Sequence, residues 1–370
     1  MMMRPTSTFL IAISLLPVMG QSKILRTDHY VTRSLSTPAK GQTTKIYVRE
    51  VKQQAASNSA APSKVVLFVH GAGTPGEVAF DVPYKDYSWM EYLAKAGFDV
   101  FAMDMTGYGR STRPQSMDNP CNLTPQQQAA FIPKLIPKQC DALDPHPLST
   151  IASDWNDIGA VVDHLLALRH VDQVSLIGWS LGGPRAGGYA SQNMQKVNRM
   201  VLLSPAYGRK TPMDPPAERP MGAVMNTQSN AEFMANWTRQ VGCPDQLDPA
   251  VAKVVWNEML ASDPVGSKWG SGIRRAPQVT TWGWNLSAAT SLKIPVLLVA
   301  PAHDKQVVPE NVRRLYEDLG STNKVFVDLA CTSHNALWEK NHTLLFQASL
   351  DWLTKGSING LQTGEVKLGY

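Results

Sequence analysis

The sequence predicts an α/β protein, namely a mostly parallel β-sheet with helices on both faces and an inserted helical cap. Short apolar runs rich in Val, Ile, Leu and Phe recur along the chain, as is typical of strands that are buried on both faces. Segments with helical spacing separate these runs, and such alternation favours parallel strands joined by helices. With 370 residues, 43% hydrophobic and 18% charged, the chain is long enough for one large domain with an insertion or for two small domains.

The strands are predicted from two kinds of hydrophobic pattern. Residues 28–35 and 43–51 alternate between polar and apolar side chains, which predicts two edge strands with one face in water. Continuous apolar runs predict strands in the interior of the sheet. These runs cover residues 64–71, 98–104, 173–179, 199–205, 294–300 and 324–329.

Helical patterns occupy the intervals between the runs. In residues 153–170 apolar side chains from Trp155 to Leu165 recur at helical spacing, and the aspartates at positions 154, 157 and 163 lie off that stripe. Residues 309–320 have a proline near the start and a glycine at the end, as helices often do. Further helices are predicted at residues 87–97 and 344–356.

Two segments interrupt the alternation. Residues 112–148 are rich in Pro and Gln, and residues 206–290 carry two predicted helices, 229–240 and 249–261, together with many Met and Trp residues. Because the strand pattern resumes directly afterwards, we interpret residues 206–290 as an inserted cap. The predicted core then comprises residues 21–205 and 291–370, with 112–148 as a second insertion.

The first twenty residues predict a cleavable secretory signal. Arg4 is their only charge, an apolar stretch runs over residues 9–19, and small residues precede a cleavage point near residues 20–21. The stretch is shorter than the ~18 apolar residues that a membrane span needs. We therefore expect a secreted or periplasmic protein without a stable membrane span. A formal net charge of only +5, with no dense basic block, argues against nucleic-acid binding.

The cysteines fit an exported protein. None of the four is spaced as in a zinc or redox site, and Cys121 and Cys140 are predicted to form a disulfide. For Cys243 and Cys331 a second disulfide and two small buried thiols remain alternatives. Four Asn-x-Ser/Thr sequons begin at residues 122, 236, 285 and 341 and matter only if the host glycosylates its proteins.

The strongest chemical signal is GWSLG, residues 178–182, at the end of an apolar run. A sharp strand-to-helix turn holds its central residue in strained geometry, and the turn closes only if Gly178 and Gly182 carry no side chain. The turn would lift the Ser180 hydroxyl above the carboxyl ends of the strands, where ligands bind in open α/β sheets. Ser180 is therefore the predicted nucleophile.

A serine nucleophile needs a base, and the base needs an orienting acid. Among the eight histidines, His334 lies between the last predicted strand and the last helix, so its loop is expected at the same end of the sheet as Ser180. Asp304 follows the run 294–300 and faces the same rim, which makes it the predicted acid. Asp214 is the alternative acid.

The tetrahedral intermediate also needs preorganised N–H donors. We expect one from the backbone of Leu181, next to the nucleophile, and one from Ala72 in HGAG, residues 70–73, after the run 64–71. Trp179, beside Ser180, is predicted to form a wall of the substrate pocket.

Taken together, these motifs resemble the α/β-hydrolase superfamily, in particular its serine esterase and lipase-like branch. The resemblance covers about residues 40–356 and rests on HGAG, on DMTGYGRS at residues 104–111, on GWSLGG, and on Asp304 and His334 in the family's Ser…Asp…His order. It implies a catalytic triad under a helical cap, with no cofactor and no metal. Two departures are the long insertion 112–148 and the signal peptide. Relatives with a carboxylate nucleophile, the haloalkane dehalogenases and epoxide hydrolases, are disfavoured by Ser180.

The favoured hypothesis is an exported serine hydrolase of carboxylic esters that acts on small to medium apolar or aromatic substrates. A lactonase, an amidase or a carbon–carbon bond hydrolase would use the same triad. A non-catalytic binding protein on this fold is the alternative from another class, but it would not require an intact triad. Met and Trp in the cap suit apolar substrates, although such side chains more often form core.

Overall fold

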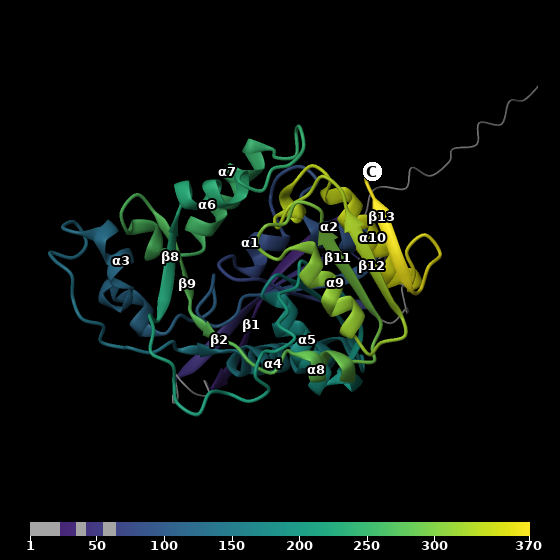
Figure 1. The fold of residues 1–370 in the computed structure, drawn as a ribbon, viewed down its shortest axis with the longest axis horizontal. Helices are drawn as coiled ribbons and strands as arrows, with labels where there is room; N and C mark the ends of the chain where they lie inside the picture. The colour runs from purple at the N-terminus through teal and green to yellow at the C-terminus, as the bar shows by residue number, and fades with distance from the viewer. Residues whose placement is uncertain (1–22, 35–41, 55–63) are drawn as a thin grey trace, which may run out of the picture.

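A computed structural model describes residues 23–34, 42–54 and 64–370 (Figure 1). The predicted signal peptide, residues 1–20, lies outside these residues. In the part of the chain that is described, no helix combines the length and apolar character needed to cross a membrane.

A large β-sheet forms the centre of the described chain. Its strand order is β1-β2-β4-β3-β6-β7-β11-β12-β13. All pairs are parallel except β1 with β2 and β2 with β4, so the predicted mostly parallel sheet is confirmed. The strands are β1 (Ile24–Ser34), β2 (Thr43–Gln53), β3 (Lys64–Val69), β4 (Phe98–Met103), β6 (Val174–Trp179), β7 (Val197–Leu203), β11 (Val296–Pro301), β12 (Lys324–Leu329) and β13 (Gly364–Leu368).

Helices cover both faces of the sheet, as predicted, and each face has its own apolar core. Successive side chains of a strand point to opposite faces, so in β3 Phe68 joins one core and Leu67 the other. One face packs α1 (Gly76–Phe80), α2 (Trp89–Lys95) and α10 (His342–Lys355). The other packs α4 (Ile151–Arg169), α5 (Gly182–Gln192), α8 (Leu286–Ser291) and α9 (Pro309–Asp318).

Two strands differ from the sequence-based expectation. Residues 43–51 form a strand as predicted, but the prediction that it lies at an edge of the sheet is wrong. Strand β2 is hydrogen-bonded to β1 on one side and to β4 on the other, and Ile46 and Val48 are fully buried. Alternation indicates which side chains face water, but it carries no information about a second strand partner. Strand β13 was not predicted, because at the far edge of the sheet it buries little besides Val366.

Apart from α8, which packs against the sheet, the chain between β7 and β11 forms a layer beside it (left and top of Figure 1). It contains the antiparallel pair β8 (Met225–Ser229) and β9 (Ile273–Pro277) and the two predicted helices, α6 (Asn230–Thr238) and α7 (Pro249–Ala261). The division into core and cap stays a prediction. Smaller elements are β5 (Ser149–Thr150) paired with β10 (Val279–Thr280), α3 (Pro125–Gln128), and short 3₁₀ turns at Gln115–Asp118, Pro120–Asn122, Ala129–Phe131, Met194–Lys196, Gly266–Lys268 and Ala336–Trp338.

The aromatic and Met side chains of this layer are mostly core. A small third cluster joins the insertion 112–148 to the β8–β9 pair, with Phe131 against Trp269. Trp237 and Trp256 on α6 and α7 are buried in the core that continues beneath them. Most of these Met and Trp side chains therefore form core, whereas Trp282 stays partly exposed.

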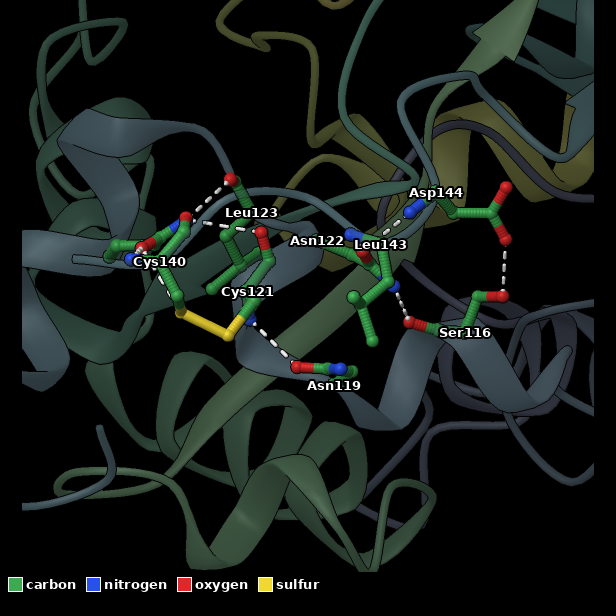
Figure 2. Close-up of a disulfide and its surroundings, with 9 residues drawn as sticks. Ser116, Asn119, Cys121, Asn122, Leu123, Cys140, Leu143 and Asp144 are labelled. Atoms are coloured by element: carbon green, nitrogen blue, oxygen red, sulfur yellow. Dashed lines mark hydrogen bonds between the residues drawn. A yellow bond between two sulfur atoms is a disulfide. The ribbon is translucent and has the colours of Figure 1, made fainter. Parts of the chain in front are cut away.

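The predicted pair Cys121–Cys140 lies at disulfide distance, with its Cα atoms 5.4 Å apart, and staples the insertion 112–148 (Figure 2). The buried Gln128 side chain donates to the carbonyls of Cys121, Leu123 and Cys140. Beside it Asn122 is fully buried, donating to Ser116 O and accepting from the Leu143 and Asp144 N–H groups. Because that amide nitrogen is enclosed, the sequon at Asn122 is a poor glycosylation site in the folded chain.

Candidate active site

Ser180 occupies a strained turn between β6 and α5. Its φ is 58°, in the left-handed region that non-glycine residues avoid. Hydrogen bonds fix this conformation, because the Ser180 N–H donates to Leu203 O at 3.0 Å and its carbonyl accepts from Ala206 N at 2.9 Å. The side chain stays partly exposed at the carboxyl end of the sheet.

Gly178 and Gly182 must lack side chains because the turn leaves no room for a Cβ atom, as the sequence indicated. A Cβ built on Gly182 would lie 2.3 Å from Val69 O, and one built on Gly178 would lie 2.6 Å from Gly182 O. Both contacts are with backbone atoms, which cannot move aside without distorting the sheet.

We expect Gly182→Ala to lower the free energy of unfolding by about 1–3 kcal/mol, because overpacking forces the backbone to shift. Gly159→Ala in α4 is the matched control, since a Cβ there would meet Tyr189 at 3.5 Å, an ordinary contact. Removing that helical glycine should stabilise the protein by about 0.5–1 kcal/mol. Urea denaturation measures both changes in stability. Equal midpoints for the two variants would show that a Cβ at position 182 does not clash with the backbone.

Asp304 and His334 are brought together at the same edge of the sheet. His334 Nδ1 hydrogen-bonds Asp304 Oδ2 at 2.8 Å, and both side chains are buried. The other Asp304 oxygen accepts from the N–H groups of Gln306 and Val307, which fixes the carboxylate. The alternative acid, Asp214, lies exposed in the loop after β7.

Two contacts hold the His334 loop beside Ser180. Trp179, the residue before Ser180, donates from its indole to His334 O at 2.9 Å, and the two rings lie 5.6 Å apart. Trp179 is itself buried against Trp338. This places the imidazole alongside the turn that carries the serine. The role of Trp179 as a pocket wall stays a prediction.

A buried carboxylate anchors the other side of the same loop. Glu339 accepts hydrogen bonds from the N–H and hydroxyl of Ser333, next to His334. It also accepts from Trp237 of α6 at 2.8 Å and from Gln246 at 3.0 Å. Burial raises the pKa of Glu339, and the four donors oppose that effect. Glu339 thus couples the histidine loop to the layer formed by residues 206–290.

The two predicted oxyanion donors lie on either side of the serine. Gly71 packs against Ser180, since a Cβ on Gly71 would lie 2.8 Å from Ser180 Cβ, and this brings the loop 70–73 beside the turn. Leu181 follows Ser180 directly. Within the described chain, neither the Leu181 N–H nor the Ala72 N–H donates to a backbone acceptor. Their role as oxyanion donors stays a prediction.

A buried ion pair supports the loop 70–73 from below. Arg185 on α5 is fully buried, pairs with Asp154 at 2.7 Å and donates to the carbonyls of His70 and Gly71, each at 2.9 Å. Burial raises the pKa of Asp154 to about 6 against the opposing effect of Arg185. Asp154 was predicted to lie off the apolar stripe of its helix, and it does, yet it is buried.

His70 itself is neutral and structural. Burial and the charge of Arg185 lower its pKa well below the usual value. Because the Met105 N–H donates to His70 Nε2 at 3.0 Å, Nδ1 carries the proton and donates to Gly71 O at 2.7 Å. His70 therefore shapes the loop and is not available as a base.

The second cysteine pair connects the layer of residues 206–290 to the histidine loop. Cys243, between α6 and α7, lies at disulfide distance from Cys331, with the Cα atoms 5.6 Å apart. Cys331 lies three residues before His334. Of the two alternatives left open by the sequence, the disulfide is the one that the structure supports.

We expect Cys243→Ala/Cys331→Ala to lower both stability and activity. The chain-entropy model assigns about 4.5 kcal/mol to a loop of this length and about 3 kcal/mol to the shorter Cys121–Cys140 loop. Cys121→Ala/Cys140→Ala is the matched control and should cost stability alone. Thermal denaturation and kcat measured at a temperature where both variants are folded separate the two effects. Equal kcat values would show that the second pair does not hold His334 in place.

Leu181 also lines a cavity of about 230 Å³. Its aromatic walls are Tyr207, Trp282 and Trp284, and Ala206 borders it next to the turn that carries Ser180. This cavity is large enough for a small apolar or aromatic group.

A sheet of parallel strands with a serine on a strand-to-helix turn and an Asp–His pair at the same edge defines the α/β hydrolases. A family model described as alpha/beta hydrolase fold matches residues 64–341, which is most of the chain. The chain belongs to this family. No curated protein matches the sequence.

Solved structures with this fold include hydrolases. A serine hydrolase involved in carbazole degradation aligns with a TM-score of 0.54 and 16% identity, over 88% of this chain and 100% of that one. A thermophilic esterase from Thermogutta terrifontis gives 0.52 and 15%, over 88% and 98%. A serine hydrolase from the polyaromatic hydrocarbon-degrading bacterium Cycloclasticus zankles gives 0.52 and 13%, over 89% and 99%. At these identities the likeness shows the fold alone.

Three site residues escaped the sequence analysis, namely Asp154, Arg185 and Glu339. Each is a charged residue inside a helix or loop, which in sequence is indistinguishable from a solvent-facing residue. The usable signal was weak: Glu339 lies five residues after His334 in CTSHNALWE, and Arg185 lies five residues after Ser180. Neither spacing demands a particular chemistry.

Proposed function

We propose that this chain is an exported serine hydrolase that cleaves carboxylic esters. The observation that carries the proposal is the Asp304–His334 hydrogen bond of 2.8 Å beside the turn that presents Ser180. A carboxylate fixed on Nδ1 leaves Nε2 of the imidazole to accept a proton, which is what a serine nucleophile requires.

In the proposed mechanism Ser180 Oγ attacks the ester carbonyl while His334 Nε2 takes its proton. Asp304 orients the imidazole and stabilises its protonated form. The N–H groups of Leu181 and Ala72 donate to the oxyanion of the tetrahedral intermediate. His334 then gives the proton to the departing alcohol, and water, deprotonated by the same imidazole, releases the acid from Ser180.

Three features support the finer parts of the proposal. The cavity beside Leu181, with its aromatic walls, suits a small or medium apolar or aromatic group. Residues 206–290 would act as the cap, because α6 is tied to the histidine loop through Trp237 and Glu339. Two cysteine pairs at disulfide distance suit an oxidising compartment, as expected for a secreted or periplasmic protein.

The test is a panel of p-nitrophenyl esters of increasing acyl length, with lactones and amides alongside, together with a fluorophosphonate probe. We expect hydrolysis of short to medium esters and a covalent adduct on Ser180. Hydrolysis of lactones or amides in preference to esters would change the substrate class but keep the triad. A folded protein that neither turns over any substrate nor reacts with the probe would rule out the serine hydrolase.

A further inference from the structure

Arg274 lies at the border of the proposed active site. It is on β9, directly opposite Gln228 of β8, and its guanidinium packs against Gly73. A Cβ built on Gly73 would lie only 2.4 Å from Arg274 Cζ. Gly73 belongs to the loop 70–73 that carries Ala72 and whose Gly71 touches Ser180. The guanidinium therefore lies across this loop from the serine.

The charge of Arg274 is not neutralised by the protein. Its Nε and Nη2 donate to the neutral amide oxygen of Gln228, at 3.1 and 3.0 Å. No carboxylate in the described residues forms an ion pair with it. The acidic groups that act on it are the phenol of Tyr108 and the carboxylate of Glu232, and that carboxylate is engaged by the N–H and hydroxyl of Ser229.

The neighbouring Arg275, by contrast, is a structural arginine whose charge is neutralised by carboxylates. Arg275 points to the other face of β9, because successive side chains of a strand alternate. It pairs with Asp263 at 2.7 Å and with Asp118 at 2.8 Å. Of the two neighbouring arginines of β9, Arg275 is thus paired with two carboxylates, whereas Arg274 is bonded only to an amide.

Leaving a partly buried guanidinium without a counter-charge is unfavourable. Burial lowers the pKa of Arg274 to about 10, so the side chain is still a cation at neutral pH. The guanidinium fork matches carboxylate geometry, and Nη1 makes no hydrogen bond within the described residues. A partly buried cation with a free donor at the rim of the proposed active site is suited to an anion that arrives with the substrate.

We propose that Arg274 binds a carboxylate of the substrate, so that the enzyme prefers esters that carry a second, ionised carboxyl group. This inference rests on the proposed ester hydrolysis and narrows its substrate class. Because only the short loop 71–73 separates the two side chains, a short aliphatic chain should join the ester carbonyl to the carboxylate. Monoesters of four- to six-carbon dicarboxylic acids meet this requirement.

The test compares monoethyl succinate, glutarate and adipate with ethyl esters of monocarboxylic acids of equal chain length. We expect the wild-type protein to favour the monoesters of the diacids. Arg274→Met should lower kcat/KM for them by about 10- to 100-fold, the value of a charge-assisted hydrogen bond, while the neutral esters change less than about twofold. Arg274→Lys keeps the charge but loses the fork and should fall in between.

Arg239→Met is the matched control, because Arg239 is an exposed arginine directly after α6 whose guanidinium, within the described chain, bonds only Asn236. It removes the same charge and should leave both substrate series unchanged. Thermal denaturation of each variant separates a folding defect from a loss of recognition. A monoester-to-neutral ratio that stays the same in Arg274→Met would overturn the inference.

A binding measurement keeps this inference separate from the catalytic proposal. In the Ser180→Ala background, calorimetric titration with monoethyl glutarate should show binding that the added Arg274→Met substitution abolishes. If that dependence is found but no ester is turned over by the wild type, the proposed hydrolysis fails and the anion site stands. If the Ser180→Ala protein does not bind the monoester, the anion site is refuted.

Discussion

Replacing Ser180 with alanine is expected to lower kcat for ester hydrolysis by about 10⁶-fold, because removal of the nucleophile of such a triad costs about as much as removal of the whole triad. The residual rate should remain above that of water, since the oxyanion donors and the binding cavity are untouched. Stability should change little: the turn is held by backbone hydrogen bonds of Ser180, which alanine keeps.

Ser204→Ala is the matched control for this result. Ser204 also has a positive φ, of 46°, and also follows a central strand, β7, next to β6. Its hydroxyl is buried without a hydrogen-bond partner in the described chain, so its loss removes no interaction. The measurements are kcat with a p-nitrophenyl ester and fluorophosphonate labelling. Full activity in Ser180→Ala, or an equal loss in Ser204→Ala, would exclude Ser180 as the nucleophile.

The sheet and the outline of the site were predictable because both depend on local patterns. Each central strand is an apolar run of six or seven residues, and its burial on both faces follows from that run. The residues that follow the parallel strands β3, β6, β11 and β12 meet at one edge of the sheet for geometric reasons alone. This is why Ala72, Ser180, Asp304 and His334 could be placed at a common rim.

What the sequence did not reveal depends on pairings between distant residues. Strand β2 was taken for an edge because its second partner, β4, lies some fifty residues further along the chain. The charges of Asp154, Arg185 and Glu339 look solvent-exposed until their partners are known, and Arg274 is distinctive only because a partner is missing. The Trp residues of segment 206–290 could not be divided between core and cavity, because burial depends on what packs over them.

Breaking the Asp154–Arg185 pair is the second change with a large expected effect. In Arg185→Met the carboxylate of Asp154 is left buried without a counter-charge, which should destabilise the protein by about 3–5 kcal/mol. The carbonyls of His70 and Gly71 also lose their donor. We therefore expect the loop 70–73 to shift, and with it the Ala72 N–H, the proposed oxyanion donor. Urea denaturation and steady-state kinetics at low denaturant measure the two consequences.

Arg169→Met is the control variant, which should lower stability without affecting the proposed active site. Arg169 ends α4 and pairs with Glu50 of β2 and with Asp99 near the amino end of β4, at the edge of the sheet opposite Ser180. It should cost stability through a broken ion pair while kcat of the folded protein stays unchanged. A comparable loss of kcat in both variants would mean that general destabilisation, and not the loop 70–73, limits the rate.

The double variant Asp154→Asn/Arg185→Met separates the two roles of the pair. Removing the carboxylate's charge together with its partner should recover much of the stability, because a buried ion pair replaced as a unit is often close to neutral. It does not restore a donor to the carbonyls of His70 and Gly71, so kcat should remain about 100-fold low, as when one oxyanion donor is lost. Because the cavity beside Leu181, the proposed binding site of the ester, is left in place, KM should change far less than kcat. Recovery of kcat together with stability would instead assign Arg185 to folding alone and leave the loop to be positioned by its own glycines.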